Sequence, residues 1–363
     1  MKPPGDSPPP TEPPPPTEPP EIGVPGKAKN VILLIGDGMG LTQITAGLYS
    51  NDNKLNLERF KVVGLHKSYS SDKLVTDSAA GATAFACGVK TYNGAIGVDH
   101  KKRPVETILE EAEKNRMATG LVATSTIVHA TPASFFAHNK YRKNYDEIAA
   151  DLVNTEVDYW VGGGKNYFEK RKDNRNITQE LIFKRNYIIK DFINDDISKM
   201  DMPLGKNIGF LTSNDDPLPV AQGRDYLIPA SMRGIDFLNK KSEDRGFFMM
   251  IEGSQIDWGG HANKLDYVVS ELIEFDKLIG QVLDFAEQDG ETLVIVTADH
   301  ETGGLAINPD SKMGMGKLKA GFTTDYHTAA LIPVFAYGPG SERFSGIYEN
   351  TAIYHKMKVA LGF

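Results

Sequence analysis

The sequence predicts an α/β fold in three layers, with a large and mostly parallel sheet between two layers of helices. Short β-rich runs alternate with helical segments along most of the chain, which is typical of this class. The helical segments carry apolar residues at intervals of three and four, so one face of each can pack against the sheet. In such sheets the ligand crevice lies beyond the carboxyl ends of the strands, and polar residues gather there in this chain.

The N-terminal segment 1–25 is expected to lie outside that fold. It holds twelve of the chain's 21 prolines and almost no apolar side chain, so it cannot pack a core. Polyproline geometry extends such a segment to roughly 60 Å for twenty residues. We therefore predict a disordered tether over 1–25, leading to a lipid anchor or envelope component upstream, and a single domain over 26–363. A recognition segment for proline-binding domains is the alternative.

The β-rich runs after the tether are short, and most end in polar residues or glycine. The expected strands cover 30–37, 61–67, 119–126, 157–163, 207–213, 246–253, 292–299 and 334–338. The clearest amphipathic helices are expected over 105–115 and 264–288. With 363 residues, of which 40% are hydrophobic, the chain can bury a large core.

The composition excludes several classes of protein. The formal net charge is −8, so no basic surface is expected for nucleic acid or anionic membranes. Apolar runs such as 31–35 are too short to cross a bilayer, and no secretory leader follows Met1, so the protein is either cytoplasmic or has lost a leader. The single cysteine, Cys87, forms no internal disulfide and is expected to be a small core residue.

The stretch VTDSAAGATA, residues 75–84, places Ser78 beside an aspartate and before a run of small residues. It lacks the G-x-S-x-G pattern of a histidine-activated serine, so a nucleophilic Ser78 needs another activator. The alternative is that Ser78 only caps a helix, because Asp and Ser favour that position. A metal ion that lowers the pKa of the hydroxyl group is one such activator.

Carboxylates and imidazoles at the ends of several β-rich runs supply ligands for metal ions. The set contains three aspartates and three histidines and no thiolate: Asp37, Asp257, Asp299, His261, His300 and His327. These donors suit two zinc ions. The oxygens of Glu252 and Thr131 suit a harder ion such as magnesium. Two metal ions about 4 Å apart are the usual apparatus for in-line displacement at phosphorus.

Six motifs, in this order, resemble those of the alkaline phosphatase family. They are GDGMG at 36–40, TDSAAGATA at 76–84, HATPASFFAHNKYR at 129–142, EGSQIDWGGHAN at 252–263, TADHETGG at 297–304, and a histidine, His327, before YGPG at 337–340. The resemblance covers nearly the whole chain after the tether. It implies the alkaline phosphatase fold, with a short crown-like insertion near 306–326, and hydrolysis of small phosphate monoesters at alkaline pH.

The resemblance also assigns roles to individual residues. One zinc ion would be held by Asp257, His261 and His327, and the second by Asp37, Asp299 and His300. A magnesium ion would be shared by Asp37, Thr131 and Glu252. Ser78 would form a phosphoserine intermediate, Arg142 would clamp the phosphate with its planar fork, and Asp77 would steady that arginine. The resemblance is compatible with a homodimer and with a periplasmic, cell-envelope or extracellular location.

Two departures from the best-known bacterial member concern the third metal and the insertion. His129 and Trp258 stand where that member has an aspartate and a lysine near the magnesium and the phosphate. An imidazole there can favour zinc over magnesium, and the loss of a lysine removes one cation from phosphate binding. The segment 306–326 is also short for the family, so a smaller crown and a smaller dimer contact are expected.

Three alternative functions are weighed against this interpretation. Sulfatases and phosphodiesterases share the fold, so the fold alone does not choose among them. A sulfatase would need Pro-x-Arg after its serine, whereas AAGA follows Ser78 here. A diesterase usually lacks an arginine clamp such as Arg142. A tethered, non-catalytic metal-binding surface protein would explain the ligands and the proline arm but would give no reason for Ser78 beside Arg142.

Overall fold

A ten-stranded sheet forms the centre of the molecule, in a computed structural model that describes residues 26–191 and 196–363. The predicted tether over 1–25 lies outside the described residues. The strand order is β14-β2-β13-β8-β1-β7-β3-β4-β6-β5. The strands are β1 (Asn30–Gly36), β2 (Val62–Lys67), β3 (Ala118–Thr126), β4 (Tyr159–Gly163), β5 (Tyr187–Asp191), β6 (Asn207–Leu211), β7 (Phe247–Gly253), β8 (Thr292–Thr297), β13 (Ile332–Tyr337) and β14 (Gly346–Glu349).

Most neighbouring strands run parallel, and β13 alone is antiparallel to both of its neighbours in this sheet of the described chain. The α/β class with a mostly parallel sheet is thereby confirmed. Two strands that the sequence pattern did not predict, β5 and β14, lie at the two edges of the sheet. Both are short and only partly buried, so neither shows the apolar run by which the inner strands are recognised.

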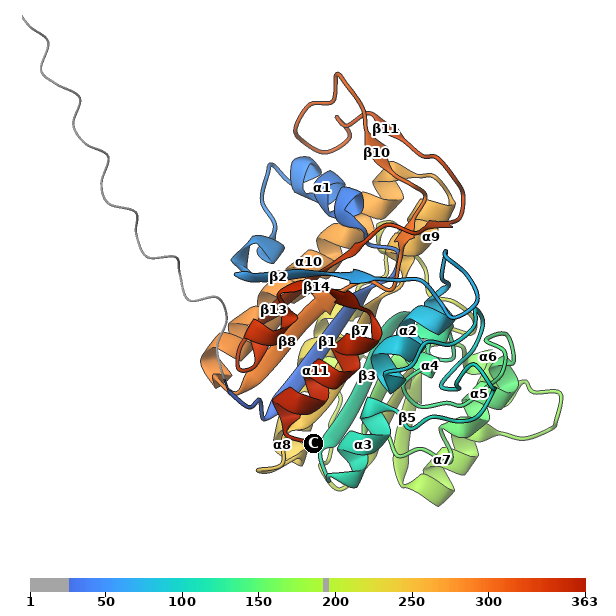
Figure 1. Ribbon diagram of the computed structural model, residues 1–363. Coiled ribbons are helices and arrows are strands. Elements are labelled where there is room, and N and C mark those ends of the chain that lie inside the picture. The colour runs from blue at the N-terminus through green and yellow to red at the C-terminus, as the bar shows by residue number, and fades with distance from the viewer. Residues whose placement is uncertain (1–25, 192–195) are drawn as a thin grey trace, which may run out of the picture.

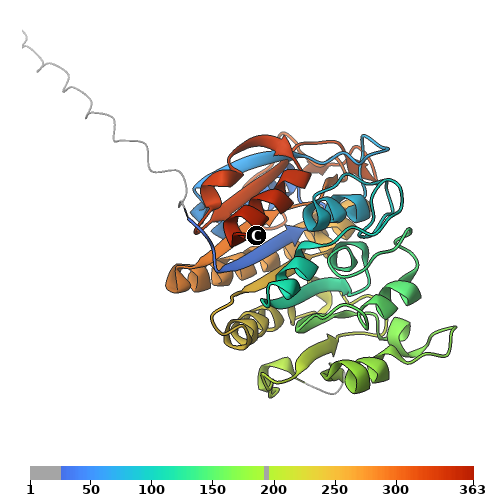
Figure 2. The ribbon, with the colours of Figure 1, turned by 60° about the horizontal axis from the view of Figure 1, so that its bottom comes forward.

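Helices cover both faces of the sheet, as Figures 1 and 2 show. On one face the core includes α8 (Leu227–Lys241) and α10 (Leu265–Asp289), with α1 (Leu41–Ser50) at its border. The opposite core includes α2 (Ser78–Cys87), α3 (Ile108–Lys114), α4 (Ala130–Ala133), α5 (Tyr145–Asp151), α6 (Lys165–Glu169), α7 (Ile177–Arg185) and α11 (Thr351–Leu361). Alternate residues of β1 enter the two cores, so both of its faces are buried. Cys87 is buried in the α2 core, as expected of a small core residue.

The remaining elements are short and lie mainly in the loops. They are the 3-10 turns η1 (Asn56–Arg59), η2 (Ile197–Lys199), η3 (Val220–Gln222) and η4 (Ser341–Phe344), the helix α9 (Gln255–His261), and the strands β9 (Glu301–Thr302), β10 (Ala306–Ile307), β11 (Ala320–Gly321) and β12 (His327–Thr328). The segment 306–326 contains the β10–β11 pair and projects beside α1 (Figure 1). Among the described helices, none combines the length and the apolar character needed to cross a bilayer.

The register of the central strands brings the motif residues together at the carboxyl ends of these strands. Gly36 at the end of β1 is aligned with Gly253 at the end of β7, and Ile35 is aligned with Thr297 at the end of β8. Because these strands are parallel, the residues that follow them leave the sheet at the same edge. The neighbouring β3 also ends there, since its Ala123 is aligned with Glu252.

Candidate metal centre and active site

Asp37, Asp299 and His300 form a fully buried cluster immediately beyond the ends of β1 and β8. The Nε2 atom of His300 lies 3.4 Å from a carboxylate oxygen of Asp37 and 3.2 Å from one of Asp299. Burial, and then the charge of Asp299, raise the pKa of Asp37, and burial likewise raises that of Asp299. Both oxygens of Asp37 lack a hydrogen-bond partner within the described chain. Such buried, unpaired acceptors suit a cation.

A second cluster, Asp257, His261 and His327, lies closer to solvent. Asp257 and His261 are one helical turn apart on α9, and His327 comes from β12. The Nε2 atoms of the two histidines are 3.1 Å apart, and the Nδ1 atom of each faces a backbone carbonyl. That arrangement orients Nε2 as the free lone pair of a neutral imidazole, which is the form that binds a metal ion. Burial, and then His300, lower the pKa of His327 to about 4.

The third cluster joins Asp37 to His129 and Glu252. Glu252 accepts a 2.6 Å hydrogen bond from Ser254, whereas its other oxygen has no partner among the described residues. Thr131, two residues after His129, has a buried hydroxyl group with no hydrogen-bond partner among the described residues. Burial, and then the charge of Arg142, lower the pKa of His129 to about 3, so this imidazole is a neutral donor. Its Nδ1 atom has no hydrogen-bond partner among the described residues, and one of its ring nitrogens lies within 4.8 Å of carboxylate oxygens of Asp37 and Glu252, so His129 can also serve as a ligand.

Ser78 is the first residue of α2, and Asp77 caps that helix by accepting the backbone N–H of Ala80 at 3.0 Å. The alternative in which Ser78 serves only as the cap therefore does not describe the structure. The hydroxyl group of Ser78 lies 3.2 Å from Nε2 of His300. A side chain on Gly81 would meet Asp299 at 2.9 Å, so this glycine lets α2 approach the fully buried cluster.

Arg142 is held by Asp77, the residue next to Ser78. A nitrogen of the guanidinium group lies 3.0 Å from the Asp77 carboxylate, and a second lies 3.4 Å from His129. The other Asp77 oxygen also accepts the backbone N–H of Gly94, so the carboxylate is fixed from several directions. Trp258 on α9 has its ring edge-to-face with that of His129, at 6.2 Å between centroids. The arrangement presents a cationic fork beside a buried hydroxyl group and the metal-ligand clusters.

Two residues next to the clusters, Thr302 and Glu301, were not expected from the sequence. The hydroxyl group of Thr302 donates to Asp257 and lies 3.2 Å from Nδ1 of His300, so it contacts both ligand sets. Glu301 accepts a hydrogen bond from Thr328, and the short strands β9 and β12 pair antiparallel at these residues. Both residues stand inside TADHETGG, directly after Asp299 and His300. Their position in that motif was the available signal.

The fold and this site together define a metal-binding hydrolase. The chain matches the sequence profile of the family described as alkaline phosphatase over residues 28–321 and 316–363. Alkaline phosphatase 3 of Bacillus subtilis is 35% identical over 421 residues, which cover 92% of this chain and 89% of that protein. Alkaline phosphatase of Escherichia coli is 30% identical over 408 residues, which cover 92% of this chain and 86% of that protein.

The fold agrees with solved structures of the same family. The alkaline phosphatase of the Antarctic bacterium TAB5 superposes with a TM-score of 0.85 at 44% identity, covering 93% of this chain and 99% of that one. A variant of that enzyme, with aspartate in place of a histidine, was solved with Mg bound in its M3 site. The chain belongs to the alkaline phosphatase family and is a phosphatase. Family membership implies bound divalent metal ions, which the three clusters can accommodate.

Proposed function

We propose that this phosphatase hydrolyses small phosphate monoesters at alkaline pH through a phosphoserine intermediate on Ser78. The observation that carries the proposal is the position of the Ser78 hydroxyl group, which is 2% exposed and lies 3.2 Å from a histidine of the fully buried cluster. The cluster of Asp257, His261 and His327 suits one zinc ion. The cluster of Asp37, Asp299 and His300 suits another. When bound, these ions supply charge neutralisation at the phosphate and at both reacting oxygens.

The residues of the chain account for the remaining steps. Arg142, fixed by Asp77, binds two phosphoryl oxygens and orients the phosphorus toward Ser78. The Ser78 hydroxyl group gives up its proton to solvent as its oxygen forms a bond to phosphorus, while the bond from phosphorus to the alcohol oxygen breaks and that oxygen takes up a proton from solvent. Water then attacks the phosphoserine, so inorganic phosphate leaves and the hydroxyl group is restored.

We further propose magnesium for the third cluster, coordinated by oxygens of Asp37, Glu252 and Thr131. All three supply oxygen ligands, and Mg is bound in the M3 site of the TAB5 variant described above. His129 makes zinc the competing ion, because an imidazole nitrogen lies within reach of the same position. Metal analysis of protein loaded with both ions distinguishes these two occupancies.

The central experiment compares wild type with Ser78→Ala on 4-nitrophenyl phosphate and on its bis-diester. Wild type should hydrolyse the monoester preferentially and yield an acid-stable phosphoserine at Ser78. The variant should lose the phosphoserine and keep its metal content, because carboxylates and imidazoles hold the ions. Preference for the diester would support a phosphodiesterase of the same fold, and no turnover of either ester by the metal-loaded protein would support a non-catalytic metal-binding protein.

We also propose a location outside the cytoplasm, in the periplasm or at the cell envelope, with segment 1–25 as a tether. Its proline content and lack of apolar side chains support that role. Fractionation of cells that express the gene tests the location, and mass spectrometry of the mature N-terminus shows whether it carries a lipid. Light scattering of the metal-loaded protein decides between a monomer and the homodimer that the family resemblance allows.

A further inference from the structure

Tyr326 covers one of the metal-ligand histidines with its ring. The rings of Tyr326 and His327 are nearly parallel, at 7° and 4.4 Å between centroids. The ring of His300 is stacked on His327 as well, at 16° and 3.5 Å. The imidazole of His327 is therefore packed against two other rings.

Hydrogen bonds hold the backbone of Tyr326, and its ring is open to solvent. Its backbone N–H donates to the hydroxyl group of Thr324, and its carbonyl accepts the N–H of Gly303. Its ring also lies 6.0 Å from that of His261, so it borders both imidazoles of the more open cluster. Tyr326 is 47% exposed, whereas His327 beneath it is 7% exposed. An exposed aromatic ring that borders two metal-ligand imidazoles is therefore available for contact.

The position of Ser78 determines which part of a substrate reaches this ring. Ser78 lies against His300, on the side of the fully buried cluster. In an in-line displacement the departing alcohol stands opposite the nucleophile across the phosphorus. Two-metal sites stabilise both the attacking and the leaving oxygen, so we take the cluster of Asp257, His261 and His327 as the side of the departing alcohol. The exposed ring of Tyr326 lies 6.0 Å from that of His261 and stacks on that of His327.

We propose that Tyr326 forms the leaving-group subsite and favours phosphate monoesters of planar, aromatic alcohols over those of small aliphatic alcohols. This inference rests on the proposed function, because it uses Ser78 as the nucleophile. An offset-stacked aromatic pair is more stable than an aliphatic contact by an amount equivalent to roughly a two- to tenfold preference.

The test measures kcat/KM of the zinc- and magnesium-loaded protein for phenyl phosphate and for ethyl phosphate. Tyr326→Leu keeps an apolar cover over His327 but removes the aromatic face, so the phenyl-to-ethyl ratio should fall by roughly two- to tenfold. Tyr326→Phe should retain the ratio of wild type. The matched control is Tyr141→Leu, since Tyr141 is also exposed and also precedes a site residue, Arg142, but lies beside Gly94.

A binding measurement separates this subsite from the chemical step. Titration calorimetry with phenylphosphonate and methylphosphonate should show a preference for the phenyl compound that Tyr326→Leu loses and Tyr326→Phe keeps. Equal changes for both compounds, or a control variant that changes the ratio as much, would overturn the proposal and leave Tyr326 as a cover for His327. If wild type hydrolyses neither ester, the proposed function fails, and the phosphonate pair still decides the role of Tyr326.

Discussion

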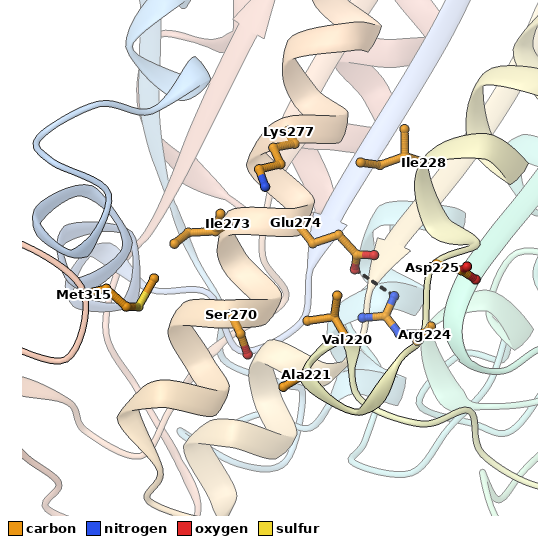
Figure 3. Close-up of a pocket in the computed structure, with 10 residues that line it drawn as sticks. All are labelled: Val220, Ala221, Arg224, Asp225, Ile228, Ser270, Ile273, Glu274, Lys277 and Met315. Carbon is orange, nitrogen blue, oxygen red and sulfur yellow. Dashed lines mark ion pairs between the residues drawn. The ribbon is translucent and has the colours of Figure 1, made fainter.

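Two groups of buried carboxylates in this molecule differ in how their negative charge is balanced. In the first group, Glu271 and Glu274 of α10 both pair with Arg224, and all three side chains are at most 10% exposed. Figure 3 shows the guanidinium group facing Glu274 at the wall of a pocket between η3 and α10. In the second group, Asp37 and Asp299 are fully buried beside neutral histidines.

This difference separates carboxylates that stabilise the fold from carboxylates that are suited to bind metal ions. Arg224 is part of the chain, so the folded protein always contains a cation that pairs with Glu271 and Glu274. Burial, against the attraction of Arg224, still raises the pKa of Glu271 to about 7. No lysine or arginine pairs with Asp37 or Asp299 among the described residues, so their charge requires an exchangeable cation.

Removal of metal ions should have the largest effect. A chelator should lower monoester turnover roughly a thousandfold, because the ions neutralise several charges in the transition state. It should also lower the free energy of unfolding by about 4 kcal/mol for each site that was held at a thousandfold excess over its Kd. Turnover assays and urea unfolding, before and after zinc and magnesium are restored, check both values. An apo protein as stable as the metal-loaded one would show that Asp37 and Asp299 do not need a bound cation for folding.

Arg224→Met should destabilise the fold by about 3–5 kcal/mol at pH 8, because two buried carboxylates lose their partner. The metal content should not change, since the substitution leaves the three ligand clusters intact. Urea unfolding with excess zinc and magnesium measures the loss. The triple variant Arg224→Met, Glu271→Gln, Glu274→Gln is the control and should recover much of the stability.

The Arg224→Met penalty should shrink as the pH falls. Burial raises the pKa of Glu271 from its ordinary 4.5 to about 7, so the folded state binds a proton more tightly than the unfolded state. Ionisation of Glu271 therefore lowers the stability of wild type as the pH rises from about 4.5 to 7. Without the attraction of Arg224 the pKa of Glu271 in the folded state is higher still, so ionisation costs more stability, and the Arg224→Met penalty grows as the pH rises through this window and above it. Unfolding of wild type and variant at pH 5 and pH 8 checks the sign, and a penalty that grows toward pH 5 would contradict it.

Arg142→Ala should lower kcat/KM for a monoester by roughly ten- to a hundredfold, which corresponds to about 1.5–3 kcal/mol. The loss on a diester should be smaller, because a diester presents one free charged oxygen fewer to the guanidinium group. Parallel assays on both ester types measure the difference. Equal losses would show that Arg142 contributes charge without clamping the phosphate.

Thr302→Val should weaken metal binding by roughly tenfold, because Thr302 orients Asp257 and contacts His300. Both clusters should be affected together, which a structural change near one cluster would not produce. Competition with a chromophoric chelator measures the affinities, and Thr45→Val on α1 is a matched control. A loss confined to one ion would show that the two clusters are not coupled through Thr302.

His129→Asp should have the smallest effect and should shift the third site toward magnesium. The carboxylate adds an anionic oxygen beside Asp37 and Glu252, so magnesium should bind more tightly and activity should depend more strongly on added magnesium. A magnesium titration and the zinc-to-magnesium ratio of both proteins measure this change. Indistinguishable values would exclude a role for His129 at the third site.

Much of this site could be predicted from the sequence because of the sheet type. Alternation of strands and helices implied parallel strands, and parallel strands end at one edge, so Asp37, Asp257 and Asp299 were expected near one another. The structure brings together the ligand sets that the family resemblance implied for the two zinc ions. The proximity of the three aspartates needed only the order of the elements and the residue types at their ends, whereas the division into two ligand sets came from the family resemblance.

Tertiary structure decided the features that depend on contacts between distant segments. The edge strands β5 and β14 pair with neighbours although their own residues lack a strong apolar pattern. The placement of His129 beside Asp37 and Glu252 joins the ends of three strands, and the contact of Thr302 with Asp257 spans 45 residues. Local periodicity carries no information about such contacts, because they arise from the register and packing of elements that only the folded chain brings together.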